Sequence, residues 1–258
     1  MNRSQALRLI SMLRSQLDRS PILDAGAGSG YIAILLAARG ARVVALDTDY
    51  SRLAQLADRL RTAPTACKVD IVVASGEQIP FTSRTFELVF CNSVLEHVQD
   101  DRMMIAECAR VLAPDGILAL TVPDQSLRFG DRYQRFWHWI WSLPQGVKNL
   151  LLDSQLAATQ DFQEAQECVE KKFDHRRRYR LESLKEILSE HHLVVVKHSS
   201  YLTRLGAFWH DIIIAFGLPA LHALAYYGHL LNRIDRALVK PTDVGKGFAL
   251  VAVREAVR

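Results

Sequence analysis

A glycine-rich segment between two apolar runs is the sequence feature that most constrains the fold. It reads Leu23-Asp-Ala-Gly-Ala-Gly-Ser-Gly30 and joins an expected strand at 21–24 to an expected helix at 32–39. Glycine permits tight turns and lets a ligand approach the main chain closely. A helix that begins behind such a loop presents free N–H groups and the positive end of its dipole. The segment therefore predicts a strand, a ligand-binding loop and a helix in succession.

The alternation of short apolar strands and helices continues along the chain. Further strands are expected at 42–47, 68–74, 86–92, 117–122, 193–197 and 248–253, and helices at 50–60, 102–111 and 181–191. Short apolar strands separated by helices pair in parallel through right-handed crossovers. We therefore predict an α/β protein with a Rossmann-like, doubly wound sheet of seven strands.

Two stretches interrupt this alternation and are expected to be helical insertions. The predicted organisation is an N-terminal amphipathic helix at 1–20, a core at 21–123, an aromatic-rich insertion at 124–180, a core helix and strand at 181–201, an apolar insertion at 202–246 and the last strand at 247–258. The N-terminal helix has Leu7, Ile10, Leu13 and Leu17 at helical spacing. Packing on the edge of the domain and contact with a membrane both fit that pattern.

Composition narrows the class of protein. The 258 residues are 49% hydrophobic and 23% charged, which is typical of a globular chain. A net charge of +4 without a dense basic face does not indicate a nucleic-acid partner.

The sequence has no CxxC pair, and its N-terminus has no long apolar run. We therefore expect no disulfide framework, no secretory signal and a cytoplasmic location. The four cysteines are Cys67, Cys91, Cys108 and Cys168.

The glycine spacing separates two classes of nucleotide-binding loop. A nicotinamide-dinucleotide fingerprint requires G-x-G-x-x-G, which would place its third glycine where this chain has Tyr31. A nicotinamide oxidoreductase is therefore disfavoured. Asp47 ends the second expected strand, where a carboxylate can accept hydrogen bonds from both hydroxyls of a ribose. Capping of the next helix, the other role for an acid in this turn, better suits Asp49.

Five motifs in the correct order resemble the class I S-adenosylmethionine-dependent methyltransferases, and more narrowly the type 11 methyltransferase domain. They are LDAGAGSG at 23–30, LD at 46–47, SGEQIPF at 75–81, FELVFCNSVLEHV at 86–98 and LAPDG at 112–116. The resemblance covers about residues 20–123 and returns more weakly at 175–201 and 247–253. It implies that the last strand is antiparallel, that S-adenosyl-L-methionine is the cofactor and that the chain is an enzyme.

The resemblance also implies cofactor-binding residues. Asp24 would orient the methionine end of the cofactor together with the loop glycines, and the backbone at Asn92 would face its amino group. The loop after the third strand would hold the adenine. Ser75 stands there where the family usually has an acid, so its contact lacks the strength of a charged acceptor. The remaining implied positions are Gly26, Gly28, Gly30, Gly76 and Glu77.

Two histidines are candidates for a general base, which methyl transfer needs only when the acceptor arrives protonated. His97 follows the fourth strand, and packing at a helix start is its alternative role. His175 opens the run HRRRYR, and a solvated basic surface is the alternative there. Relatives that bind a metal through E-x-x-E-H have an acid where this chain has Ser93, so we predict no metal.

The insertions are expected to choose the methyl acceptor. Arg176, Arg178 and Tyr179 could bind an acidic group, while Trp137 and Trp141 could line an apolar pocket, form an interfacial belt or fill a helical core. Residues 212–231 contain no Asp, Glu, Lys or Arg, and they fit either a buried lid or a helix pair dipping into one membrane leaflet.

These observations predict a methyltransferase acting on an O, N or C atom of a hydrophobic or lipid-linked small molecule, with peripheral contact to the inner face of the membrane. The alternative is a membrane-associated binding or scaffold protein that has the same fold without turnover. The oligomeric state is left open.

Overall fold

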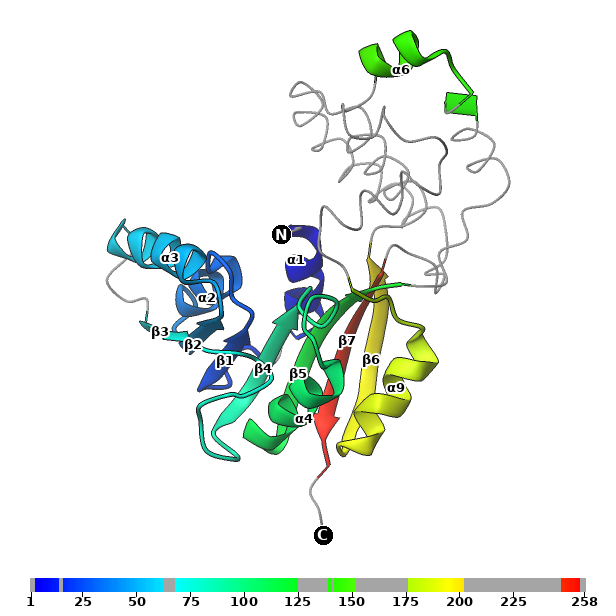
Figure 1. Ribbon diagram of the computed structural model, residues 1–258. Coiled ribbons are helices and arrows are strands. Elements are labelled where there is room, and N and C mark those ends of the chain that lie inside the picture. Colours follow the sequence, from blue (N-terminus) through cyan, green and yellow to red (C-terminus); the bar gives the residue numbers. More distant parts are fainter. Residues whose placement is uncertain are drawn as a thin grey trace. The chain divides into compact units, whose positions relative to one another are not determined.

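Seven strands of the described residues form a sheet in the order β3-β2-β1-β4-β5-β7-β6 (Figure 1). The computed structural model describes residues 3–13, 16–62, 68–124, 139–140, 142–151, 176–201 and 247–255. The strands are β1 Ile22–Ala25, β2 Arg42–Asp47, β3 Lys68–Val73, β4 Phe86–Asn92, β5 Leu112–Pro123, β6 Leu193–Tyr201 and β7 Gly247–Arg254. Strands β1 to β5 pair in parallel, and β7 runs in the opposite direction. The predicted seven-stranded fold is confirmed, including its antiparallel last strand.

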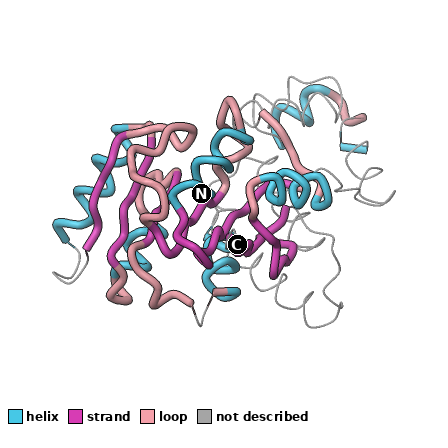
Figure 2. Tube along the Cα trace, turned by 90° about the horizontal axis from the view of Figure 1, so that it is seen from below, coloured by secondary structure: helices cyan, strands magenta, loops and turns pink. Residues whose placement is uncertain are grey.

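Helices cover both faces of this sheet, as the end-on view in Figure 2 shows. The helices of the first unit that the structure describes are α1 Arg3–Met12, α2 Tyr31–Ala37, α3 Tyr50–Thr62, α4 Asp101–Val111 and α9 Leu181–Glu190, and α6 Gln145–Leu151 belongs to a second unit. Side chains of α1, α2 and α3 pack into one core and those of α4 and α9 into the other. Successive strand residues alternate between the two cores, as Ile22 and Leu23 do in β1. Burial on both faces explains why these strands read as continuous apolar runs.

Strand β5 begins five residues earlier than the expected start at Ile117. Leu112 pairs with Phe86 of β4, and regular pairing resumes with Ile117 opposite Leu88. The turn around Asp115, whose φ is +58°, lies inside the strand as an irregularity. The sequence showed the turn but not the pairing that precedes it.

Helix α1 packs on the domain. Ala6, Leu9 and Leu13 are fully buried in the core that α2 and α3 share, whereas Leu7 is 48% exposed. The expectation that Leu7 belongs to the apolar stripe was therefore wrong, and Leu9 takes that place. Nε of Arg8 also donates to Oγ of Ser199 on β6, 3.0 Å away. Both contacts hold α1 against the sheet.

The chain divides into two compact units. The first contains the sheet and consists of Met1–Pro123, Arg178–Ser199 and Phe248–Arg258; the second consists of Asp124–Arg177 and Ser200–Gly247. Within the part of the chain that the structure describes, no helix is both long enough and apolar enough to cross a bilayer. The uncharged run 212–231 lies outside the described residues.

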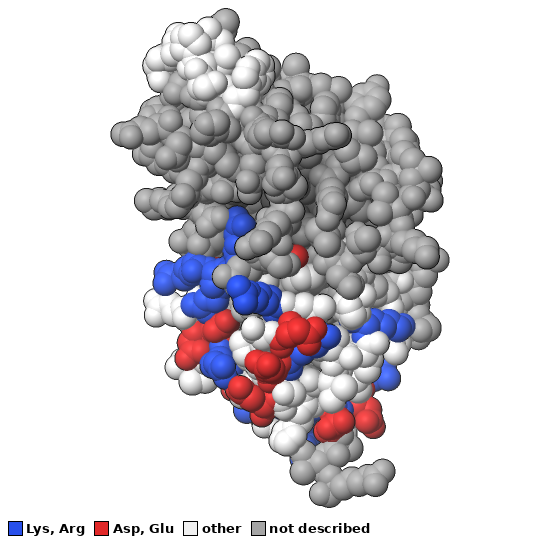
Figure 3. Space-filling model, turned by 90° about the vertical axis from the view of Figure 1, so that its right-hand side faces the viewer, with Lys and Arg blue, Asp and Glu red and all other residues white. Residues whose placement is uncertain are grey.

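Charged side chains of both signs are interspersed on the face shown in Figure 3. Nζ of Lys185 lies 2.9 Å from Oε1 of Glu182, and Arg102 pairs with Glu190. Such exposed pairs contribute little to stability. This mixture on the face shown differs from the single-sign surface that nucleic-acid binding favours.

Candidate functional site

The strand order places a ligand-binding site where β1 and β4 lie side by side. The chain runs outward from β1 to β2 and β3, then returns to β4 on the other side of β1. Ligands of open α/β sheets bind at the carboxyl ends of the strands at such a reversal. The glycine loop follows β1 and Asn92 ends β4, so both lie at this edge.

All three loop glycines adopt left-handed backbone conformations. The φ angles are +82° at Gly26, +54° at Gly28 and +78° at Gly30. A Cβ on Gly26 would lie 2.3 Å from Cγ2 of Val94, and one on Gly30 would lie 2.2 Å from Cδ1 of Leu56. At Gly28 the nearest atoms belong to Arg52, 4.0 Å away. The outer two glycines thus allow protein packing, while the middle one leaves room for a ligand to approach the backbone.

Asp47 connects the glycine loop to the turn after β2. Its Oδ2 accepts the main-chain N–H of Gly28 at 2.7 Å, and its Oδ1 accepts that of Asp49 at 2.9 Å. An ionised carboxylate offers about four acceptor positions, so two bonds leave capacity for the hydroxyls of a ribose. Asp49 itself accepts N–H bonds from Ser51 and Arg52 at the start of α3, as expected for a helix cap.

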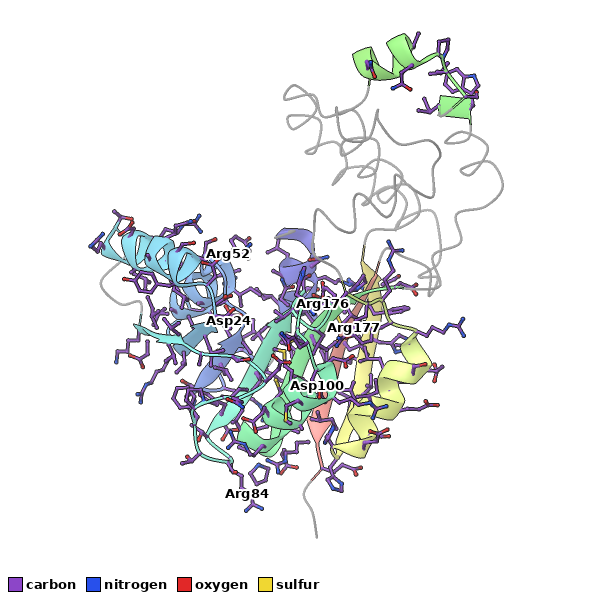
Figure 4. All side chains as sticks on the ribbon, viewed as in Figure 1. Asp24, Arg52, Arg84, Asp100, Arg176 and Arg177 are labelled. Carbon is purple, nitrogen blue, oxygen red and sulfur yellow. The ribbon has the colours of Figure 1, made fainter. Side chains whose placement is uncertain are left out.

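Asp24 is buried at the end of β1, at the same end of the sheet as Arg52 and opposite Arg84 (Figure 4). Burial raises the pKa of Asp24 to about 7, a shift that the N–H of Ala33 opposes and the nearby Asp47 reinforces. Its Oδ2 has no hydrogen-bond partner among the described residues. A buried polar atom without a partner is costly, so this oxygen is available for a donor from a ligand.

Asn92 presents the complementary group. It is 3% exposed, and its Nδ2 has no hydrogen-bond partner among the described residues. Its Oδ1 accepts a bond from the hydroxyl of Thr121 at 3.2 Å. An unpaired acceptor on Asp24 and an unpaired donor on Asn92 therefore lie on neighbouring strands. These two groups fit the ammonium and the carboxylate of an amino acid.

The loop after β3 is braced internally. The Ser75 hydroxyl accepts the N–H of Glu77 at 3.1 Å and lies 3.3 Å from Oε2 of the same side chain. Oε1 of Glu77 accepts the N–H of Asp100 at 2.6 Å, which ties this loop to the start of α4. A Cβ on Gly76 would lie 2.7 Å from Cε of Met104, so the loop packs closely on α4.

The loop after β4 contains His97 and a buried acid that sequence reasoning did not assign to the site. The N–H of His97 donates to the carbonyl of Val94 at 2.9 Å. Glu96 is 2% exposed, and its Oε2 has no hydrogen-bond partner among the described residues. Burial raises the pKa of Glu96 to about 7. An acid in a loop is normally exposed, so the pattern around His97 did not indicate that Glu96 is buried.

The candidate substrate residues fall into separate groups. Arg176 and Arg178 are exposed, and Tyr179 is buried. The Tyr179 hydroxyl lies 3.1 Å from the Leu95 carbonyl and 2.8 Å from Oδ2 of Asp101, contacts that anchor the loop after β4. The other two substrate candidates, Trp137 and Trp141, and the candidate base His175 lie outside the described residues. Among the residues that are described, no cluster of three or more metal-ligating side chains occurs.

Comparison with known proteins finds similarity to methyltransferases. Residues 23–120 match the model of the methyltransferase domain family. Over 96 residues the chain is 36% identical to the ubiquinone biosynthesis O-methyltransferase of Photobacterium profundum, covering 37% of this chain and 40% of that protein. Over 117 residues it is 34% identical to the biotin biosynthesis bifunctional protein of Cellvibrio japonicus, covering 45% and 22%. The matches thus span less than half the length of either relative.

The fold is also that of solved methyltransferases. The magnesium protoporphyrin IX methyltransferase from Synechocystis, solved with bound S-adenosylhomocysteine, superposes with a TM-score of 0.56 at 14% identity, covering 97% of this chain and 82% of that one. Residues 23–120 thus form a methyltransferase domain, and the fold is that of the class I S-adenosylmethionine-dependent enzymes. The family and the cofactor expected from the sequence are confirmed at this level.

Proposed function

We propose that this protein transfers a methyl group from S-adenosylmethionine to an O, N or C atom of a hydrophobic or lipid-linked small molecule. The observation that carries the proposal is the set of polar groups at the β1/β4 edge. A braced carboxylate at Asp47 suits a ribose, and the unpaired Oδ2 of Asp24 and Nδ2 of Asn92 suit an amino-acid end. One ligand with both ends, an adenosyl methionine, would satisfy all three groups.

The cofactor would bring an electrophilic methyl group on a sulfonium, and the protein has to hold a nucleophile in line with it. Such positioning can lower the barrier by ~7–11 kcal/mol. Ser75, Gly76 and Glu77 would contact the adenine. Gly28 would let the cofactor approach the backbone, and Gly26 and Gly30 would allow the loop to pack closely around it. His97 and His175 are the proposed bases for an acceptor that arrives protonated.

Two features support an apolar acceptor. The sequence around Trp137 and Trp141 is rich in aromatic residues, and the run 212–231 is uncharged, so the insertions are apolar in composition. Ubiquinone biosynthesis, named for one relative, is one setting for such acceptors. We propose that Arg176, Arg178 and Tyr179 recognise an acidic group on the acceptor, and that the protein works in the cytoplasm with peripheral contact to the inner face of the membrane.

The proposal is tested in two steps. Calorimetry with S-adenosylmethionine should show micromolar binding that Gly28→Val abolishes, because a side chain at Gly28 would occupy the approach to the backbone. Radiolabelled methyl transfer is then assayed against a total lipid extract and a soluble extract. Label in the lipid fraction supports the apolar acceptor, and label only in the soluble fraction refutes it. If the intact protein does not bind the cofactor, the proposal that it is a methyltransferase is refuted.

A further inference from the structure

A chain of hydrogen bonds behind Asn92 fixes the orientation of its amide. Thr121 on β5 is the direct neighbour of Asn92 in the parallel register, and its side chain is fully buried. The N–H of Ser93 donates to Oγ1 of Thr121 at 2.9 Å. The Ser93 hydroxyl donates in turn to Oε1 of Gln5 on α1 at 2.8 Å. Four residues from three elements and one loop are therefore linked.

The Thr121 hydroxyl proton has two acceptors within reach, Oδ1 of Asn92 at 3.2 Å and the Ser93 hydroxyl at 3.3 Å, and the contact with Asn92 is the shorter. Oγ1 of Thr121 already accepts from the Ser93 main chain, so its own proton is free to be donated. Oδ1 of Asn92, 3.2 Å away, accepts it. The oxygen of the amide then faces Thr121, and the NH₂ group faces away from it. This orientation explains why Nδ2 is the unpaired atom of Asn92.

We propose that Thr121 is a positioning residue that aims Nδ2 of Asn92 at the carboxylate on the methionine end of the cofactor. The inference rests on the proposed function and adds a role for the Asn92 side chain. An NH₂ group can only donate, so it selects an acceptor such as a carboxylate, and Oδ2 of ionised Asp24 selects the neighbouring ammonium. Asn92 and Asp24 together recognise an amino acid, and Thr121 prevents the amide from turning its oxygen toward the carboxylate.

The test compares two ligands that share the adenosine and the thioether. S-adenosylhomocysteine has the amino-acid end, and 5′-methylthioadenosine lacks both its carboxylate and its ammonium. Calorimetry of Thr121→Val should show about tenfold weaker S-adenosylhomocysteine binding, the factor expected for one misdirected hydrogen bond. Binding of 5′-methylthioadenosine should stay within about twofold. Thr121→Ser, which keeps the hydroxyl, should restore S-adenosylhomocysteine binding to within about threefold of the wild type.

A double variant shows whether Thr121 acts through Asn92. Asn92→Ala should weaken S-adenosylhomocysteine more than Thr121→Val does, and adding Thr121→Val to Asn92→Ala should cause no further loss. Equal loss for both ligands, or additive losses in the double variant, would overturn the positioning role and leave the enzyme intact. Failure of the wild type to bind either ligand would overturn the proposed function instead. If Thr121→Val does not fold, unchanged S-adenosylhomocysteine affinity in Asn92→Ala refutes the inference.

Discussion

The main-chain N–H of Gly28 donates a hydrogen bond to Oδ2 of Asp47 across a distance of 2.7 Å. The same carboxylate accepts the N–H of Asp49, so it connects the turns after β1 and β2. Backbone donors aimed at both oxygens of a carboxylate fix its direction. The ribose end of the site is therefore arranged by the chain itself, before a nucleoside arrives.

Asp47→Ala should weaken S-adenosylhomocysteine and 5′-methylthioadenosine by the same factor, about 30-fold or more, because both ligands have the ribose. Asp49→Ala is the matched control. Its exposed carboxylate caps α3 and pairs with Arg52, so affinity should change by less than about threefold. Titration calorimetry measures both. Unchanged affinity in Asp47→Ala would show that the ribose does not bind at this edge of the sheet.

Cofactor affinity should depend on the ionisation of Asp24. Its pKa is raised to about 7 by burial, so below pH 7 the free protein holds a proton there. An ammonium favours the ionised form, so binding should release that proton. Affinity for S-adenosylhomocysteine should therefore fall by up to about tenfold per pH unit below pH 7. Asp24→Asn should bind S-adenosylhomocysteine weakly, and its affinity should not depend on pH in this way. If the pH dependence persists in this variant, another group releases the proton.

Glu96 should make the fold less stable as the pH rises. Its pKa is raised from 4.5 to about 7 in the folded chain, so between these values the folded state holds more protons than the unfolded state. The neutral carboxyl thus makes its full contribution to the free energy of unfolding below about pH 4.5. This contribution, about 3 kcal/mol at most, is lost as the pH rises through 7. Glu96→Gln should flatten the dependence. Urea unfolding at pH 5 and pH 8 measures it, and identical slopes for wild type and variant would contradict it.

Gly30→Ala and Gly40→Ala separate backbone strain from packing. Both glycines have positive φ, +78° and +91°, so an added side chain costs about 1 kcal/mol at either position. At Gly30 the new carbon would also lie 2.2 Å from Leu56, whereas at Gly40 no atom lies within 4 Å. Gly30→Ala should therefore lower the free energy of unfolding by about 1–3 kcal/mol more than Gly40→Ala. Equal losses would mean that Leu56 moves aside without cost.

The sequence predicted the parts of the site that depend on local spacing. A glycine loop behind a strand and an acid at the end of the next strand identified Gly28 and Asp47, because parallel strands bring their carboxyl ends to one edge. The doubly wound sheet of seven strands followed from the same alternation. Strand ends were less predictable, since the start of β5 depends on the pairing of Leu112 with Phe86.

Roles that arise only from tertiary contacts could not be predicted. Thr121 is a typical strand residue in the sequence, and it acquires a role because Asn92 is its neighbour on β4. Glu96 stands between Leu95 and His97, and no local sequence pattern indicates that its carboxyl is buried. Tyr179 was predicted to contact substrate, a role that stays a prediction, while the structure shows its hydroxyl near Leu95 and Asp101.

Strand β7 lies between β5 and β6 although it is the last of the seven along the chain. During synthesis β6 therefore emerges before the strand that will join it to the rest of the sheet. Until residues 124–246 have been synthesised, β7 is missing and the main-chain N–H and C=O groups at the edge of β5 have no partner strand. A nascent chain that stalls in this interval exposes a strand edge that is covered in the folded protein. Aggregation or capture by a chaperone is therefore most favoured at this stage.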